Sequence, residues 1–202
     1  YAYRKLSSDD QARLLQWRKM NRLPLHEPPH FEDGVQRYMI TGACYEHRPI
    51  LDSDSRRTVF SRELLVACGD IAECDVRAWV VLRNHYHILL QGTLEQLRPA
   101  LGKLHNRTAS IWNREDDAPG RRVWYRFGDR RIRSEGHYFA TLNYIHANPV
   151  RHRCAQKSTE WPWSSLQRWL EDCGEAYLRE LWKAYPVDEY GKDGMIFEAR
   201  RA

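Results

Sequence analysis

The chain has 202 residues, 42% of them hydrophobic, which suffices for the core of one ordinary domain and excludes a largely disordered protein. No run approaches the ~18 apolar residues of a membrane-spanning helix, and the first residues lack the apolar core of a signal peptide. A net charge of +5 favours a polyanionic partner, and five cysteines without a Cys-x-x-Cys pair indicate reduced thiols and a cytoplasmic protein.

The first part of the chain is predicted to be an extension followed by a strand and a helix. Residues 1–34 are interpreted as a helix and a proline-rich connector. The weak alternation over 35–45 indicates the first strand. A helix is expected over 61–75, capped by Ser61, because apolar residues recur there with a helical period.

A histidine pair lies in the next stretch, Trp79–Leu90, which indicates two strands of a hairpin or one long kinked strand. Because side chains alternate along a strand, His85 and His87 face the same way, about 6–7 Å apart, while Tyr86 faces the core. Two imidazoles on one face can bind one metal ion. They can equally be surface or core histidines.

A second helix is expected to start near Pro99 and to show its basic groups outward, His105 among them. An arginine-rich segment with interleaved aromatic residues follows. It suits contact with nucleic acid, although a solvated edge strand would have the same composition. The candidate DNA contacts are Arg121, Arg122, Arg126, Arg130, Arg131 and Arg133.

A further helix is predicted from Tyr138, ending near Pro149 because proline disfavours a helical residue before it. Tyr144 and Asn148 are four residues apart and therefore share a face. Tyr144 can supply a nucleophilic oxygen, and Asn148 can supply an oxygen ligand. Tyr138 is a rival nucleophile, and His146 is interpreted as structural, exposed, or a ligand or proton relay.

The element order predicts an α+β fold of the ferredoxin-like βαββαβ type, with an antiparallel sheet and helices on one face. We expect an N-terminal extension (1–34), a catalytic domain (35–153) and a C-terminal helical extension with a tail (154–202). Within the last segment, one helix should end near Gly174 and another should follow over about 175–184.

Three stretches, "AWVVLRNHYHILLQG", "LNYIHANPVRHRC" and "TEWPWSSLQRW", resemble a known family. Their residues and spacing are similar to the HUH endonucleases with one catalytic tyrosine, and within these to the REP-associated tyrosine transposases, relatives of the bacterial TnpA transposases. The resemblance covers roughly residues 36–170.

This resemblance implies a transposase that cuts single-stranded DNA beside REP-like hairpins. It implies one Mg²⁺ or Mn²⁺ ion on His85, His87 and Asn148, and attack by Tyr144 that leaves a 5′-phosphotyrosine and a free 3′-hydroxyl. The chain departs from many relatives in having Asn148 where they have Gln. Relatives act as dimers or monomers, and a monomer is the expectation here.

Three other functions are compatible with parts of the pattern. Replication-initiation nucleases share the same core motif. Histidine-triad hydrolases need a third histidine where this chain has Leu89. A DNA-binding protein that keeps the fold without cleavage would use the arginines alone.

Overall fold

One antiparallel sheet, with strand order β2-β3-β1-β4, forms the centre of the protein. The computed structural model describes residues 16 and 34–187. The strands are β1 (Gln36–Ala43), β2 (Asp75–Val81), β3 (His85–Gly92) and β4 (Gly128–Arg131). The helices are α2 (Asp54–Gly69), α3 (Leu94–Glu115), α4 (Glu135–Arg151), α5 (Leu166–Cys173) and α6 (Glu175–Ala184), with short 3-10 turns η2 (Tyr45–His47) and η3 (Ser158–Glu160).

The order β1-α2-β2-β3-α3-β4 confirms the predicted βαββαβ arrangement, with the histidine stretch as a hairpin. The helix expected near the N-terminus and the tail from residue 191 lie outside the described residues. The domain boundary placed after residue 153 stays a prediction. No helix in the described part of the chain is both long and apolar enough to cross a bilayer.

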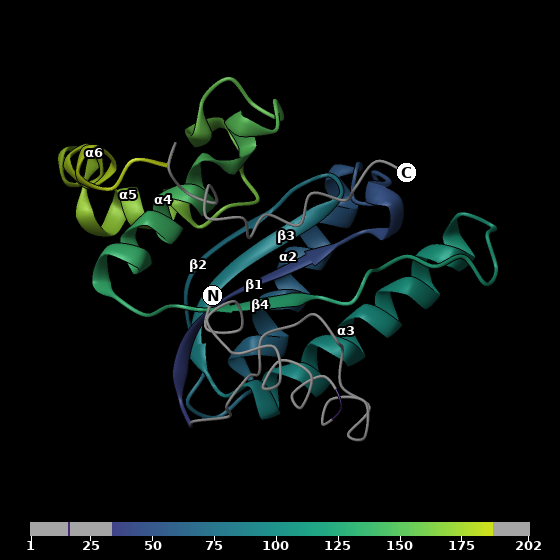
Figure 1. The fold of residues 1–202 in the computed structure, drawn as a ribbon. Helices are drawn as coiled ribbons and strands as arrows, with labels where there is room; N and C mark the ends of the chain where they lie inside the picture. The colour runs from purple at the N-terminus through teal and green to yellow at the C-terminus, as the bar shows by residue number, and fades with distance from the viewer. Residues whose placement is uncertain (1–15, 17–33, 188–202) are drawn as a thin grey trace. The chain divides into compact units, whose positions relative to one another are not determined.

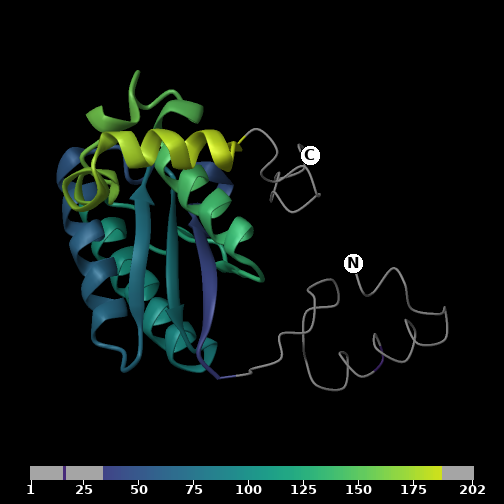
Figure 2. The same cartoon turned by 90° about the vertical axis from the view of Figure 1, so that its left-hand side faces the viewer.

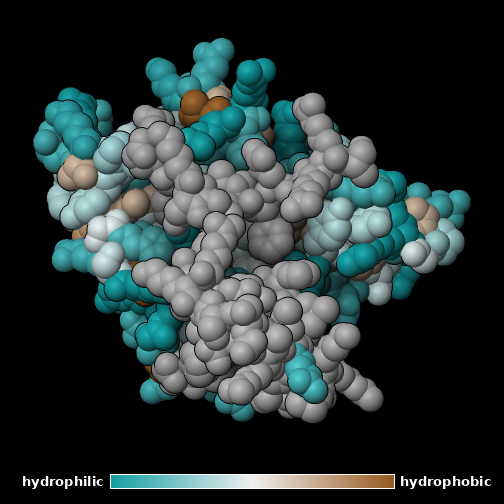
Figure 3. Space-filling model, viewed as in Figure 1, coloured by the Kyte–Doolittle hydropathy of each residue, from teal (hydrophilic) through white to brown (hydrophobic). Residues whose placement is uncertain are grey.

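Helices cover both faces of the sheet (Figures 1 and 2), and each face carries its own core. Tyr38, Ile40 and Ile88 point to the face covered by α2 and α3. Met39 and Leu89, one residue out of phase, point to the opposite face, which α4 covers together with α5 and α6. The face seen in Figure 3 is mostly hydrophilic wherever described residues form it.

Tyr86 is the largest fully buried side chain of the first core. It lies opposite Gly42 on β1, and a Cβ atom at Gly42 would be 2.2 Å from Tyr86 Cε1. Phe60 packs against the same ring, with 5.3 Å between ring centroids. Only glycine therefore leaves room for the Tyr86 ring at this position of β1.

We expect Gly42→Ala to destabilise the protein by roughly 1–3 kcal/mol, because the added methyl overlaps the fully buried Tyr86 ring. Urea unfolding would measure the change. Gly102→Ala is the matched control: Gly102 lies in α3 with no atom within 4 Å of an added Cβ. It should be neutral or stabilising by about 1 kcal/mol. Equal effects of the two substitutions would contradict the steric explanation.

Several helix ends differ from the sequence predictions, including the end of α2 at Gly69 rather than residue 75 and the start of α4 at Glu135 rather than Tyr138. The helix expected at Ser61 begins at Asp54, because Ser53 Oγ caps it by accepting from the Arg56 amide, and Ser61 is buried inside it. The helix expected near Pro99 begins at Leu94. α4 continues past Pro149 to Arg151, since a proline so close to the end costs few helical hydrogen bonds.

The prediction that His105 faces outward is wrong. The residue is 7% exposed, its Nε2 lies 3.0 Å from the Tyr86 hydroxyl, and its ring stacks on Trp124 at 4.3 Å. Burial lowers the pKa of His105 to about 4. Its neutral form therefore belongs to the folded state.

This depressed pKa predicts acid sensitivity. Between about pH 6.5 and pH 4 the unfolded chain binds a proton at His105 that the folded chain does not, so stability falls as the pH is lowered. At about 1.4 kcal/mol for each pH unit, lowering the pH from 7 to 5 should cost roughly 2 kcal/mol from this residue. His105→Gln should show a correspondingly smaller loss in urea titrations. An unchanged pH dependence would contradict the assignment.

The segment Trp161–Ser165 lies along the outer edge of β2. The Val81 amide donates to the Trp163 carbonyl at 2.9 Å, and the Ser165 amide donates to the Trp79 carbonyl at 2.9 Å. The guanidinium of the buried Arg57 lies 4.1 Å from the Trp163 ring. The segment thus protects the sheet edge and joins α2 to the second core.

Candidate functional site

The histidine pair lies at the start of β3, on the face covered by α4. His85 pairs with Ala43 and His87 with Thr41 on β1. Both side chains are buried, and their ring centroids are 5.0 Å apart. Tyr86 points to the opposite core, as the strand alternation predicts.

Hydrogen bonds orient the ring of His85. Asn84 donates from Nδ2 to the His47 carbonyl at 2.9 Å, which leaves its Oδ1 for His85 Nδ1, 2.7 Å away. Because an amide oxygen only accepts, His85 Nδ1 carries the proton, and Nε2 keeps a lone pair. A histidine held in this tautomer can ligate a metal through Nε2.

His87 is oriented by the neighbouring strand. Its Nδ1 lies 2.8 Å from the Thr41 hydroxyl. Its Nε2 is buried and makes no hydrogen bond to any residue that the structure describes. A buried nitrogen without a partner is costly, so this atom is suited to a ligand.

Helix α4 places Tyr144 and Asn148 over the pair. The half-buried Tyr144 ring lies 5.4 Å from the His87 ring between centroids. Asn148 is fully buried, and its Nδ2 donates to the Tyr144 carbonyl at 2.8 Å. Its Oδ1 accepts no hydrogen bond from the described part of the chain.

These atoms fit a metal ion. His87 Nε2 and Asn148 Oδ1 are buried and have no hydrogen-bond partner of ordinary geometry among the described residues, and the tautomer of His85 provides a lone pair on its Nε2. The Asn148 side chain also lies close enough to His85 to favour the charged form of that ring. No three His, Cys, Asp or Glu side chains among the described residues are arranged to hold a metal, so a third protein ligand has to be of another type. Asn148 is such a group.

Both histidines are neutral near pH 7. Burial lowers the pKa of His85 to about 3, with nearby His152 adding to the shift and Asn148 opposing it. Burial also lowers the pKa of His87 well below its usual value, and the neighbouring His85 and His152 lower it further. A metal therefore need not displace a proton from either ring.

The structure adds residues that the sequence did not single out. The His152 ring lies 4.7 Å from that of His85, and the Arg151 guanidinium lies 5.6 Å from the Tyr144 ring. Both follow Pro149, where the helix was expected to end. Recognising that α4 continues would have placed His152 one turn from Asn148.

The two other candidates on α4 are placed away from the pair. Tyr138 lies under the Arg37 guanidinium, and Arg37 pairs with Gln91 near the far end of β3. Six residues separate Gln91 from His85, or about 20 Å along a strand. His146 is buried in the second core region, where its Nε2 lies 2.9 Å from Ser165 Oγ.

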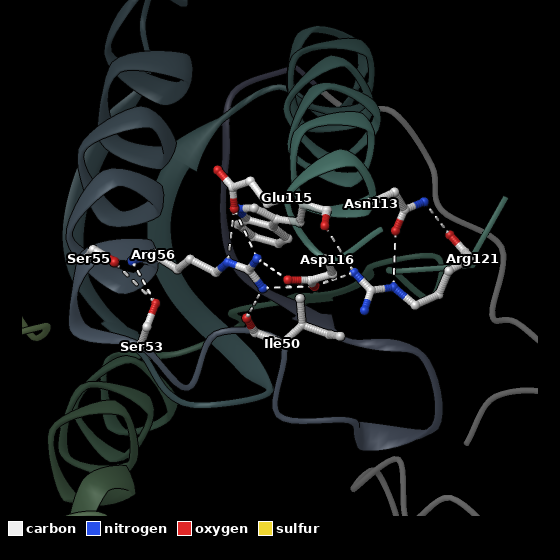
Figure 4. Close-up of polar contacts among 9 residues, drawn as sticks. Ile50, Ser53, Ser55, Arg56, Asn113, Glu115, Asp116 and Arg121 are labelled. Atoms are coloured by element: carbon white, nitrogen blue, oxygen red, sulfur yellow. Dashed lines mark hydrogen bonds and ion pairs between the residues drawn. The ribbon is translucent and has the colours of Figure 1, made fainter. Parts of the chain in front are cut away.

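The six arginines do not form one cluster. Arg121 braces the connection after α3, donating to Asn113 Oδ1 at 3.0 Å and to Asp116 Oδ2 at 2.7 Å (Figure 4). Arg130 and Arg131 belong to the edge strand β4, where Arg131 donates to Gln36 Oε1. The remaining three arginines, which precede or follow β4 in the sequence, are exposed: Arg122, Arg126 and Arg133.

Asp116 also binds Arg56 of α2, so that one carboxylate joins two guanidinium groups (Figure 4). Hydrogen bonds from Arg56 and then Arg121 lower the pKa of Asp116 to about 2. These contacts give Arg121 a structural role that its place in an arginine run did not indicate.

Comparison with known proteins finds similar proteins both by sequence and by structure. A curated REP-associated tyrosine transposase from Escherichia coli (strain K12) is 29% identical over 96 residues, which are 46% of this chain and 55% of that protein. A solved REP-associated tyrosine transposase, bound to a REP hairpin, superposes with a TM-score of 0.59 over 87% of this chain and 98% of that one, at 18% identity. The chain resembles the REP-associated tyrosine transposases.

This likeness to REP-associated tyrosine transposases confirms the α+β fold and the resemblance found in the sequence. The sequence match spans about half the length of the curated relative. No protein-family profile matches the chain.

Proposed function

We propose that the protein is a REP-associated tyrosine transposase that cuts and rejoins single-stranded DNA beside a hairpin. The observation that carries the proposal is the position of the Tyr144 ring, whose centroid lies 5.4 Å from that of His87, over two neutral histidines and beside His87 Nε2, which makes no hydrogen bond to a described residue. The relative that superposes on the chain is bound to a REP hairpin, which supports a DNA hairpin as the partner.

Tyr144 is the proposed nucleophile. Its hydroxyl loses a proton as the oxygen attacks the scissile phosphorus and forms a 5′-phosphotyrosine bond. The bond to the 3′-oxygen breaks, and that oxygen takes up a proton to become a free hydroxyl, so protons balance. Attack by another 3′-hydroxyl reverses the step and releases the tyrosine. Arg151, beside the Tyr144 ring, is positioned to attract the phosphate.

His85, His87 and Asn148 would hold one Mg²⁺ or Mn²⁺ ion through His85 Nε2, His87 Nε2 and Asn148 Oδ1, of which the last two lack a hydrogen bond among the described residues. When bound, such an ion stabilises the charge that develops on the phosphate. Asn84 and Thr41 keep both imidazoles in the orientation that ligation needs.

We also propose that the protein acts as a monomer in the cytoplasm. Tyr144 and the histidine pair of the same chain already lie together, so the site needs no tyrosine from a second copy. Reduced cysteines agree with this location.

The first experiment is cleavage of labelled single-stranded hairpins taken from repeats that flank the gene. The wild type should cut in Mn²⁺ or Mg²⁺ but not in EDTA, and should form a protein–DNA adduct that survives denaturation. Tyr144→Phe should lose both by at least about 100-fold, since the ring stays and the nucleophilic oxygen goes. Denaturing gels report cut DNA and adduct together.

Tyr138→Phe is the control, because Tyr138 lies at the far end of β3 and should be dispensable for cutting. Normal cleavage by Tyr144→Phe would exclude Tyr144 as the nucleophile. Binding without cleavage of any repeat by the wild type would favour a DNA-binding protein that has lost the reaction.

Metal binding can be tested without DNA. At about 100 times its dissociation constant, Mn²⁺ should raise the free energy of unfolding by about 2.7 kcal/mol. His87→Gln should lose most of this gain, whereas His105→Gln, which changes a buried histidine of the other core, should keep it. Thermal unfolding with and without Mn²⁺ measures both. Equal gains in the two variants would place the metal elsewhere.

A further inference from the structure

An aromatic cluster with one arginine lies just beyond the end of β1. The rings of Tyr45 and Tyr125 are 4.9 Å apart between centroids, and the Arg122 guanidinium lies 4.7 Å from the first and 5.6 Å from the second. The exposed His47 ring is 6.1 Å from Tyr125. We call these four residues the stacking cluster.

The stacking cluster does not belong to either hydrophobic core. Both tyrosines are only half-buried, and neither packs in the core on its side of the sheet. Trp124, between Arg122 and Tyr125 in sequence, is by contrast fully part of the first core. Core packing therefore explains Trp124 and leaves the flanking Tyr125 and Arg122 unexplained.

The cluster adjoins the histidine pair. Ala43, the last residue of β1, pairs with His85 and accepts a hydrogen bond from the Tyr125 amide at 2.9 Å. Paired residues of neighbouring strands point to the same face, so the row from Thr41 through Ala43 leads from the histidines to the turn at Tyr45. A DNA strand held at the histidines would pass this turn.

The turn is held in one shape. Glu46 and His47 have φ angles of 54° and 52°, a region that non-glycine residues seldom adopt. The amide of Asn84 fixes the His47 carbonyl, and the His47 amide donates to the Cys44 carbonyl at 3.0 Å. Asn84 therefore orients the His85 ring and the turn together.

We propose that the stacking cluster binds an unpaired nucleobase next to the phosphate that would lie at the histidine site. This inference rests on the proposed function and names the part of the single strand that the cluster contacts. Aromatic faces stack on any base, whereas bases in a duplex already stack on their neighbours. The Nε of Arg122 donates to the Trp124 carbonyl, and among the described residues its terminal nitrogens make no hydrogen bond or ion pair, which leaves them for the adjoining phosphate.

Binding of two labelled probes tests the proposal. One is an oligodeoxythymidylate of about 12 nucleotides, and the other is an abasic strand of equal length and charge. Affinities are measured in EDTA with Tyr144→Phe as the parent, so that no cleavage occurs. The parent should prefer the strand with bases. Tyr125→Ala should weaken binding of that strand about tenfold and leave the abasic strand unchanged, and Tyr125→Phe should restore the preference.

Two further variants separate stacking from charge and from general effects. Arg122→Ala should weaken binding of both probes and lower the salt dependence by about one phosphate contact. Tyr177→Ala, which removes a tyrosine that is 47% exposed on α6, should leave both affinities unchanged. Urea unfolding of each variant checks that it folds.

The outcomes also distinguish this proposal from the proposed function. Three results would overturn the stacking cluster as a base site. Tyr125→Ala could weaken the binding of both probes equally, it could change the binding of neither, or the parent could fail to bind the thymidylate. Base preference that depends on Tyr125, in a protein that cuts no repeat, would retain the cluster and reject the cleavage reaction. If the wild type cuts a repeat but its base preference does not depend on Tyr125, the cleavage reaction would stand and the base site would be rejected.

Discussion

The packing of Tyr86 against Gly42 is the contact on which the site depends. Tyr86 is fully buried on the α2–α3 side of the sheet, so the alternation of β3 directs His85 and His87 to the side of α4. A slip of one residue would place a tyrosine under α4 and both histidines in the aromatic core. Gly42 opposes this slip, because it leaves space for one large ring at one position.

Helices α5 and α6 carry no proposed metal ligand, but they hold α4, which carries Asn148, in place. Asn143 of α4 donates to the carbonyls of Leu181 and Tyr185, at 3.1 and 2.8 Å, in and just after α6. His146 of the same helix meets Ser165, which also accepts from the Trp79 amide of β2. The position of Tyr144 over the histidines thus depends on residues beyond 153, although the sequence predicted that these residues form a separate extension.

Local patterns in the sequence predicted the parts of the site that each lie within one element. Strand alternation predicts that His85 and His87 point to the same face of the sheet, and helix geometry predicts that Tyr144 and Asn148 share a face of their helix. The partners that orient the rings depended on register between strands, and nothing local to Thr41 pairs it with His87. The predicted start of α2 was wrong for a related reason. Ser53 and Ser61 are both plausible caps, and tertiary packing selects between them.

The arginine run shows a different limit. Composition marks residues 121–133 as one basic segment, but contacts from three other elements divide it. Arg121 is bound by Asp116 at the end of α3, Arg131 by Gln36 of β1, and Arg122 lies on the tyrosines beside η2. The number of arginines in the sequence therefore overstated the size of the basic surface. The aromatic residues of the same run lie partly in the core and partly at the surface.

The unsatisfied atoms of the site are an argument about function as well as geometry. Burying His87 Nε2 and Asn148 Oδ1 without partners costs about 1–3 kcal/mol each, and apolar side chains in their place would avoid that cost. Their other polar atoms are satisfied, by Thr41 and by the Tyr144 carbonyl, so each residue is held with its free atom in place. Because burial lowers the pKa of His87, its ring is uncharged near pH 7, and Nε2 has the lone pair when Nδ1 donates to the Thr41 hydroxyl. The proposed cation would give both atoms the partner that they lack among the described residues.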